Sequence, residues 1–119
     1  MFLRIRRKKW FGLIGILVQL PVIFSLGSCR SWDRTYTLSD LEGKDPAVRI
    51  MAIRWAGENN VKEALPLLVE RLSEEDESVR FFAIFALKRI TGEDKGYDYK
   101  ADIRNRRESV QRWRKYIGE

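Results

Sequence analysis

One short pattern occurs twice in this chain, and it constrains the fold more than any other feature. The segment Asp-Pro-Ala-Val-Arg at 45–49 is followed 31 residues later by Asp-Glu-Ser-Val-Arg at 76–80, and Ala52 aligns with Ala83 at the same spacing. A self-match with a period of roughly 30 residues is typical of stacked helical units, each of which buries its apolar face against its neighbours. The sequence therefore predicts an all-α fold.

Three amphipathic helices are predicted between residues 45 and 92. Asp45 and Asp76 are suitable N-caps, and Pro46 suits a first helical position. Gly57 with the two following asparagines ends the first helix, and Thr91-Gly92 ends the third. Turns of about four residues force successive helices to be antiparallel. The expected apolar stripes are Val48, Met51, Ala52, Trp55 and Ala56, then Val61, Ala64, Leu65, Leu68, Val69 and Leu72, then Val79, Phe82, Ala83, Ala86, Leu87 and Ile90.

Three residues of these helices need separate comment. Pro66 lies inside the second helix, where it should kink the helix or push its first turn out of line. Phe81 and Phe85 lie off the third stripe and make that helix apolar nearly all round. Such a helix is either buried centrally or carries an exposed apolar face. We expect central burial, because a repeat on one side and a terminal cap on the other would cover it.

The first repeat resembles a known family. Asp-Pro-x-Val-Arg-x-x-Ala-x-x-x-x-Gly at 45–57, followed by Ala-Leu-Pro-Leu-Leu at 64–68, is similar to HEAT-like repeats of the bacterial type also seen in phycobilisome lyases. The resemblance implies a short antiparallel helical-hairpin array, a fragment of an α-solenoid. It also implies a structural ladder of ion pairs between adjacent repeats, formed by Asp45, Arg49, Asp76 and Arg80. An anion site formed by the two arginines is the alternative.

The tail, residues 93–119, is expected to be a polar loop and a helix that caps the array. Ile103, Val110, Trp113 and Ile117 share one face of the helix, with Trp113 as its anchor. Terminal units of solenoids need a polar outer face. The opposite face is basic and consists of Arg104, Arg106, Arg107, Arg112, Arg114 and Lys115.

The first 28 residues are expected to be a lipoprotein signal peptide. Five basic residues before position 10 are followed by an uncharged run over 10–26, an order typical of secretory signals. Leu26, Gly27, Ser28 and Cys29 then resemble the lipobox of bacterial lipoproteins. The resemblance implies cleavage before Cys29 and its acylation. The alternative is an uncleaved transmembrane helix, and both place residues 30–119 outside the cytoplasm.

Composition narrows the function classes. Five of the 23 basic residues and none of the 17 acidic residues precede residue 29. Residues 29–119 therefore carry 18 basic and 17 acidic residues. The high pI therefore reflects the leader, and no nucleic-acid partner is expected. The chain has no histidine and a single cysteine, which argues against acid–base catalysis by histidine and a Cys-rich metal site. No cofactor or metal is expected.

The sequence thus predicts four regions: the signal peptide at 1–28, the lipidated cysteine and tether at 29–37, the HEAT-like repeats at 38–92, and the loop with its basic capping helix at 93–119. The expected function is that of a lipid-anchored, non-enzymatic protein-interaction or scaffold module in a bacterial cell envelope. The partner is a protein of unknown identity, and a homodimer is one option because so few repeats make a marginal array. Two alternatives are anionic headgroup binding by the basic helix and a lyase-like enzyme.

Overall fold

The computed structural model describes residues 35–119, and every regular element among them is helical. No helix in this range is long and apolar enough to cross a bilayer. The signal helix expected before it falls outside the described residues. In chain order the elements are the 3-10 turn η2 (Leu38–Glu42), α2 (Pro46–Glu58), the 3-10 turn η3 (Lys62–Ala64), α3 (Leu65–Arg71), α4 (Glu77–Thr91) and α5 (Ile103–Ile117).

The helix ends follow local capping chemistry. The Asp45 carboxylate accepts a hydrogen bond from the Ala47 amide at 2.9 Å, with Pro46 in the first turn of α2. The Asp76 carboxylate caps α4 by accepting from the Ser78 amide at 2.8 Å. Gly92 ends α4 with φ of 80°, a left-handed conformation that glycine adopts without strain. These termini lie where the capping signals in the sequence place them.

The second helix is interrupted at Pro66. Residues 62–64 form the 3-10 turn η3, and α3 begins only at Leu65 with Pro66 in its first turn. A proline is tolerated there because the first amides of a helix have no partner within it. The chain thus displaces the first turn and avoids a proline inside a continuous helix.

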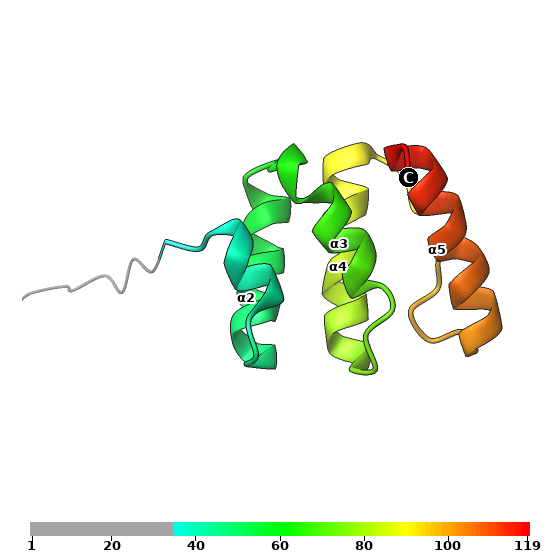
Figure 1. The fold of residues 1–119 in the computed structure, drawn as a ribbon, viewed down its shortest axis with the longest axis horizontal. Coiled ribbons are helices and arrows are strands. Elements are labelled where there is room, and N and C mark those ends of the chain that lie inside the picture. The colour runs from blue at the N-terminus through cyan, green and yellow to red at the C-terminus, as the bar shows by residue number, and fades with distance from the viewer. Residues whose placement is uncertain (1–34) are drawn as a thin grey trace, which may run out of the picture. The chain divides into compact units, whose positions relative to one another are not determined.

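The elements form two layers. Figure 1 shows α2 and α4 side by side and running in the same direction, with α3 antiparallel to both. The turn η2 packs on α2, and α3 packs on α4. The shared core lies between these layers and consists mainly of Leu41, Ala52, Ile53, Ala56, Leu68, Val69, Leu72, Val79, Ala83 and Leu87, with Trp113 from α5.

Gly57 has a different role from the one expected. The sequence suggested that it ends the first helix, but α2 continues through it to Glu58. Gly57 is buried where α2 meets α4, and a Cβ at this position would lie 3.0 Å from both Cα and Cβ of Ala86. The glycine therefore allows two helices to approach closely.

The segment 93–102, called the strap below, replaces the second helix of the second repeat. In Figure 1 the strap travels back along α4, so that α5 runs in the same direction as α4. The helix α5 packs on α3, and Trp113 anchors it with no exposed surface, as expected. Ile103 was placed on the same face, but it is 57% exposed because it lies in the first turn, beyond the packed part of α5.

Candidate functional site

The repeated aspartates and arginines hold turns together. Asp45 and Asp76 cap their own helices through backbone amides. Arg49 Nη1 donates to the carbonyls of Gly43 at 2.7 Å and Lys44 at 3.1 Å. Arg80 Nη1 donates in the same way to two carbonyls of its preceding turn, as described below. The motif therefore builds the same turn–helix junction twice.

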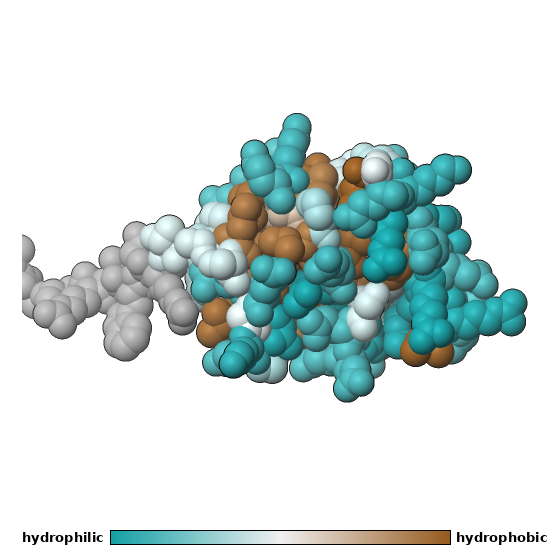
Figure 2. Space-filling model, viewed as in Figure 1, coloured by the Kyte–Doolittle hydropathy of each residue, from teal (hydrophilic) through white to brown (hydrophobic). Residues whose placement is uncertain are grey.

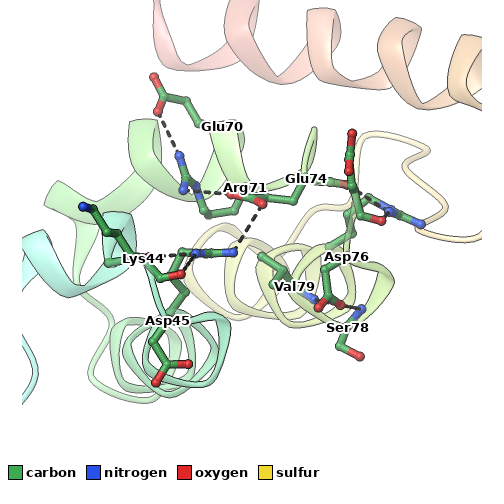
Figure 3. Close-up of polar contacts among 12 residues, drawn as sticks. Lys44, Asp45, Glu70, Arg71, Glu74, Asp76, Ser78 and Val79 are labelled. Atoms are coloured by element: carbon green, nitrogen blue, oxygen red, sulfur yellow. Dashed lines mark hydrogen bonds and ion pairs between the residues drawn. The ribbon is translucent and has the colours of Figure 1, made fainter.

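The link between the two repeats passes through Glu74. Its carboxylate lies 3.5 Å from Arg49 Nη2 and 2.9 Å from Arg71 Nη1, and Figure 3 shows Glu74 beside Arg71. The expected ladder of Asp45 and Asp76 with the arginines takes this different form. The aspartates are occupied by helix amides, so a glutamate of the intervening turn supplies the negative charge. The structure does not bring the two arginines together as an anion site either, because Nη1 of each donates to the carbonyls of its own turn and Glu74 pairs with Arg49.

Arg80 ties the second turn to the strap. It is 6% exposed and donates to the carbonyls of Glu74 at 2.9 Å, Glu75 at 2.6 Å and Tyr99 at 3.1 Å. Tyr97, further along the strap, is buried and donates its hydroxyl proton to the Leu72 carbonyl at 2.6 Å. Burial raises the pKa of the Tyr97 phenol to about 12, and the nearby arginine charges only partly oppose this.

The predicted basic face of α5 separates into three groups. Arg106 and Arg112 hold the strap, donating to the carbonyls of Ala101 at 2.6 Å and Lys95 at 2.9 Å. Arg104 pairs with Glu108 at 3.4 Å on the surface of α5. Within residues 35–119, no side-chain hydrogen bond or ion pair involves Arg107, Arg114 or Lys115.

Two other residues of α5 complete the attachment of the strap. Ser109 is buried and donates to the Gly96 carbonyl at 3.0 Å, and the Trp113 indole N–H donates to the Asp94 carbonyl at 3.2 Å. At the start of α5, the Asn105 amide donates to the Asp102 carboxylate and is the main cause that lowers the pKa of Asp102. Side chains of α5 thus donate hydrogen bonds to backbone carbonyls of the strap. In a regular second helix, backbone amides of the same helix would supply these bonds.

The remaining predicted site residues, those of the lipobox-like motif, lie outside the described residues 35–119. Cys29, Leu26, Gly27 and Ser28 precede the described residues. Among residues 35–119, no group of histidine, cysteine or acidic side chains could hold a metal ion.

The most exposed apolar residues include the two phenylalanines that were expected to be buried. Phe81 is 39% exposed and Phe85 is 55% exposed. The expectation of central burial was wrong because α2, α3 and the strap cover only part of α4, and no other described element covers these rings. A stripe at i and i+4 was visible in the sequence, but the path of the strap was not.

The exposed rings belong to a continuous cluster, called the aromatic surface below, that consists of Phe81, Phe82, Phe85 and Tyr99. The Phe81 ring centroid lies 5.2 Å from Phe82, 5.1 Å from Tyr99 and 6.4 Å from Phe85, with the first two pairs edge-to-face. Such geometry is favourable for aromatic pairs. Sequence reasoning missed Tyr99 here, since no local pattern predicts which helix face the strap reaches.

Three shallow hollows border the aromatic surface. One lies between α2 and α4 and is lined by Arg54, Glu58, Phe82, Phe85 and Arg89, with Gly57 and Ala86 at its base. The others lie on the strap side of α4, around Phe81 and Tyr99. Exposed aromatic side chains are enriched in protein-interaction sites, and neighbouring hollows can accept side chains of a partner.

The face of the molecule seen in Figure 1 is mostly hydrophilic. Figure 2 shows hydrophobic residues gathered over the middle of this face, above α3, with hydrophilic residues around them. The apolar side chains of α3 that reach the surface, Leu65 and Leu67, are half-buried. They are less accessible than Phe85 of α4.

The comparisons with known proteins bear on the repeat fold. No curated protein and no solved structure matches the chain. The family model for HEAT repeats matches residues 36–103, which is more than half of the chain and includes both turn–helix junctions and the strap. This match confirms the HEAT-like repeat predicted from the motif at 45–57. The chain therefore belongs to the HEAT repeat family.

Proposed function

We propose that this chain is a lipid-anchored scaffold protein of a bacterial cell envelope, and that its aromatic surface binds a protein partner. HEAT repeats are commonly protein-interaction modules, and the family is typically non-enzymatic. The observation that carries the proposal is the exposure of Phe81 and Phe85 on α4. The absence of histidine argues against the lyase-like alternative, because histidine is the commonest general base in enzymes.

The aromatic surface supplies a physical reason to bind. Burying an exposed phenylalanine stabilises a complex by roughly 25 cal/mol per Å² of apolar area removed from water. Aromatic residues in well-packed pockets carry much of the binding energy of protein interfaces. The Phe81 ring is also held by edge-to-face contacts with Phe82 and Tyr99 before binding, so this side chain loses little freedom on association.

A matched pair of variants tests this role. Phe85→Ala removes a ring of the aromatic surface, whereas Ile103→Ala removes an equally exposed apolar side chain on α5, since the two are 55% and 57% exposed. After cross-linking in intact cells, the wild type and Ile103→Ala should retain the same protein, and Phe85→Ala should lose it about tenfold. Equal recovery by all three chains would refute a role for this surface.

The anchor part of the proposal rests on the leader sequence. The basic residues, the uncharged run at 10–26 and the lipobox-like Leu26–Cys29 support acylation of Cys29 and a domain that faces the periplasm or the exterior. Two or more acyl chains anchor a protein stably, where one does so only marginally. Mass spectrometry of the mature protein should find an acylated amino-terminal Cys29. An intact leader with a free Cys29 thiol would favour the transmembrane anchor.

A second candidate function uses α5. Arg107, Arg114 and Lys115 are the basic side chains of α5 that bind nothing else among the described residues. On a domain held near a bilayer, each could contribute about 1 kcal/mol of attraction to anionic headgroups. Binding to vesicles with anionic lipid should then fall with added salt and on replacing the three residues by glutamine. Equal binding to neutral vesicles would exclude it.

A further inference from the structure

Four exposed residues form one continuous line along α4. Glu77, Phe81, Phe85 and Arg89 are spaced at i, i+4, i+8 and i+12. Residues four apart are neighbours on a helix surface, so the four side chains make a single ridge about 18 Å long. Glu77 and Arg89, at its ends, have no side-chain hydrogen bond or ion pair with any other residue in 35–119. We call this line the α4 ridge.

The charges of the α4 ridge are arranged antisymmetrically. A carboxylate lies at one end, a guanidinium lies at the other, and two phenylalanines lie between them. If a second α4 packs antiparallel about a two-fold axis near Ala83, Glu77 of each copy faces Arg89 of the other. Phe81 of each copy then lies beside Phe85 of the other. A parallel arrangement would place like charges together, so the ridge is self-complementary in one direction only.

We propose that the protein partner of the aromatic surface is a second copy of this chain, docked with the two α4 helices antiparallel. This inference rests on the proposed function and names the partner for it. Ridges of residues four apart on two helices pack together in the commonest class of helix crossing, at about 50°. The packing therefore requires no unusual geometry.

The charged residues that flank the α4 ridge favour a partner that carries the same charge pattern as the ridge. On the α2 side Arg54 pairs with Glu58 at 3.4 Å, and on the strap side Lys88 pairs with Asp94 at 3.9 Å. Both flanking pairs are neutral, so the uncompensated charges of the ridge are at its two ends. A docked partner should therefore offer one cation and one anion separated by two apolar side chains, which is what another α4 ridge presents.

The ridge offers four side chains from each copy, fewer than the roughly 20–30 residues a side of a standard stable interface, which buries about 800 Å² on each partner. We therefore expect a weak, reversible dimer, and two copies anchored to one membrane would meet at a raised effective concentration. Weak association of this kind is sensitive to the sign of facing charges.

Charge reversal tests the arrangement in the full-length chain, kept in a mild non-ionic detergent and followed by sedimentation velocity. Glu77→Arg and Arg89→Glu should each weaken self-association about tenfold, because each places like charges together at both ends of the contact. Mixing the two variants should restore association, since every facing pair is then opposite in sign. The double variant Glu77→Arg with Arg89→Glu should also associate like the wild type.

Glu63→Arg and Lys62→Glu are the matched controls, since both residues are exposed and lie off α4. They should leave association unchanged, and circular dichroism checks that each variant is folded. If the mixed variants fail to associate, or single reversals have no effect, the antiparallel dimer is refuted. If the chain stays monomeric while Phe85→Ala still loses a different protein from cells, this inference fails and the proposed function stands.

Discussion

Arg80 offers the sharpest test of how the second repeat is held together. Its guanidinium donates to three backbone carbonyls, two in the turn before α4 and one in the strap. Arg80→Met keeps the length and apolar character of the side chain while removing all three hydrogen bonds. Because Arg80 is 6% exposed, water cannot reach all of the carbonyls that lose their donor.

The size of the effect follows from those three bonds. A hydrogen bond to a charged group contributes about 1.5–3 kcal/mol to stability. The carbonyls of Glu74 and Glu75 lie in a turn that is half-buried to exposed, so water recovers part of their loss. Removing a buried charge also relieves its desolvation. We therefore expect Arg80→Met to lower the free energy of unfolding by about 3 kcal/mol, out of a total of about 5–15 kcal/mol for a domain.

Arg49 is the internal control, because it occupies the same position of the first repeat. It donates to two carbonyls and pairs with Glu74, but it makes no contact with the strap. Arg49→Met should therefore cost less, about 2 kcal/mol. In a domain of this size 1 kcal/mol shifts the Tm by about 4–8 °C, so Arg80→Met should lower it by about 12–24 °C.

Thermal unfolding followed by circular dichroism measures both variants, and limited proteolysis measures the strap. Trypsin should cleave after Lys95 or Lys100 faster in Arg80→Met than in Arg49→Met, because of these two arginines only Arg80 donates a hydrogen bond to the strap. A loss of less than about 5 °C for Arg80→Met would refute the reasoning. So would a larger loss for Arg49→Met or equal cleavage of the two variants.

Two further predictions concern close packing and burial. Gly57→Leu should destabilise the fold by about 1–3 kcal/mol in urea unfolding, since even a Cβ would lie 3.0 Å from Ala86, and an unchanged midpoint would contradict this. Tyr97→Phe should cost about 1–3 kcal/mol by leaving the buried Leu72 carbonyl without its donor, measured by the same method. The folded pKa of Tyr97, about 12, lies above its ordinary value, so its contribution is complete below about pH 10 and is lost as pH rises through 12. The stability difference between wild type and Tyr97→Phe should therefore shrink from pH 10 to 12, and a constant difference would contradict the burial of the phenol.

The parts of the fold that were predictable depend on local chemistry. Asp76 and Gly92 delimit α4 because a carboxylate can cap nearby amides and a glycine can adopt positive φ without help from distant residues. Helix α5 and its anchor Trp113 followed from the spacing of a few apolar side chains. Pro66 signalled a break, although its position alone left a kink and a displaced turn as equal options.

The parts that were not predictable depend on where distant segments meet. The fate of Phe81 and Phe85 was set by the path of the strap, which no periodicity encodes. The same holds for Arg80, whose third acceptor lies 19 residues away in sequence. The role of Gly57 also required the neighbouring helix, because a glycine that ends a helix and one that lets another helix approach look alike in sequence.

The direction of α5 decides which surface is open to a partner. A regular second helix would run antiparallel to α4 and present a stripe on which the next repeat could stack. Here the strap takes that path, and α5 returns parallel to α4. Exposed basic residues of α5 such as Arg107 and Lys115 have no ion-pair partner among residues 35–119. Stacking another repeat there would bury these charges without partners, which is costly. The array is therefore closed at α5, and growth by stacking is disfavoured at that end. The exposed side of α4 differs, because its flanking charges are already paired, its rings gain from being covered, and an antiparallel second copy would pair Glu77 with Arg89. Association through the side of the array is thus the arrangement that this surface favours.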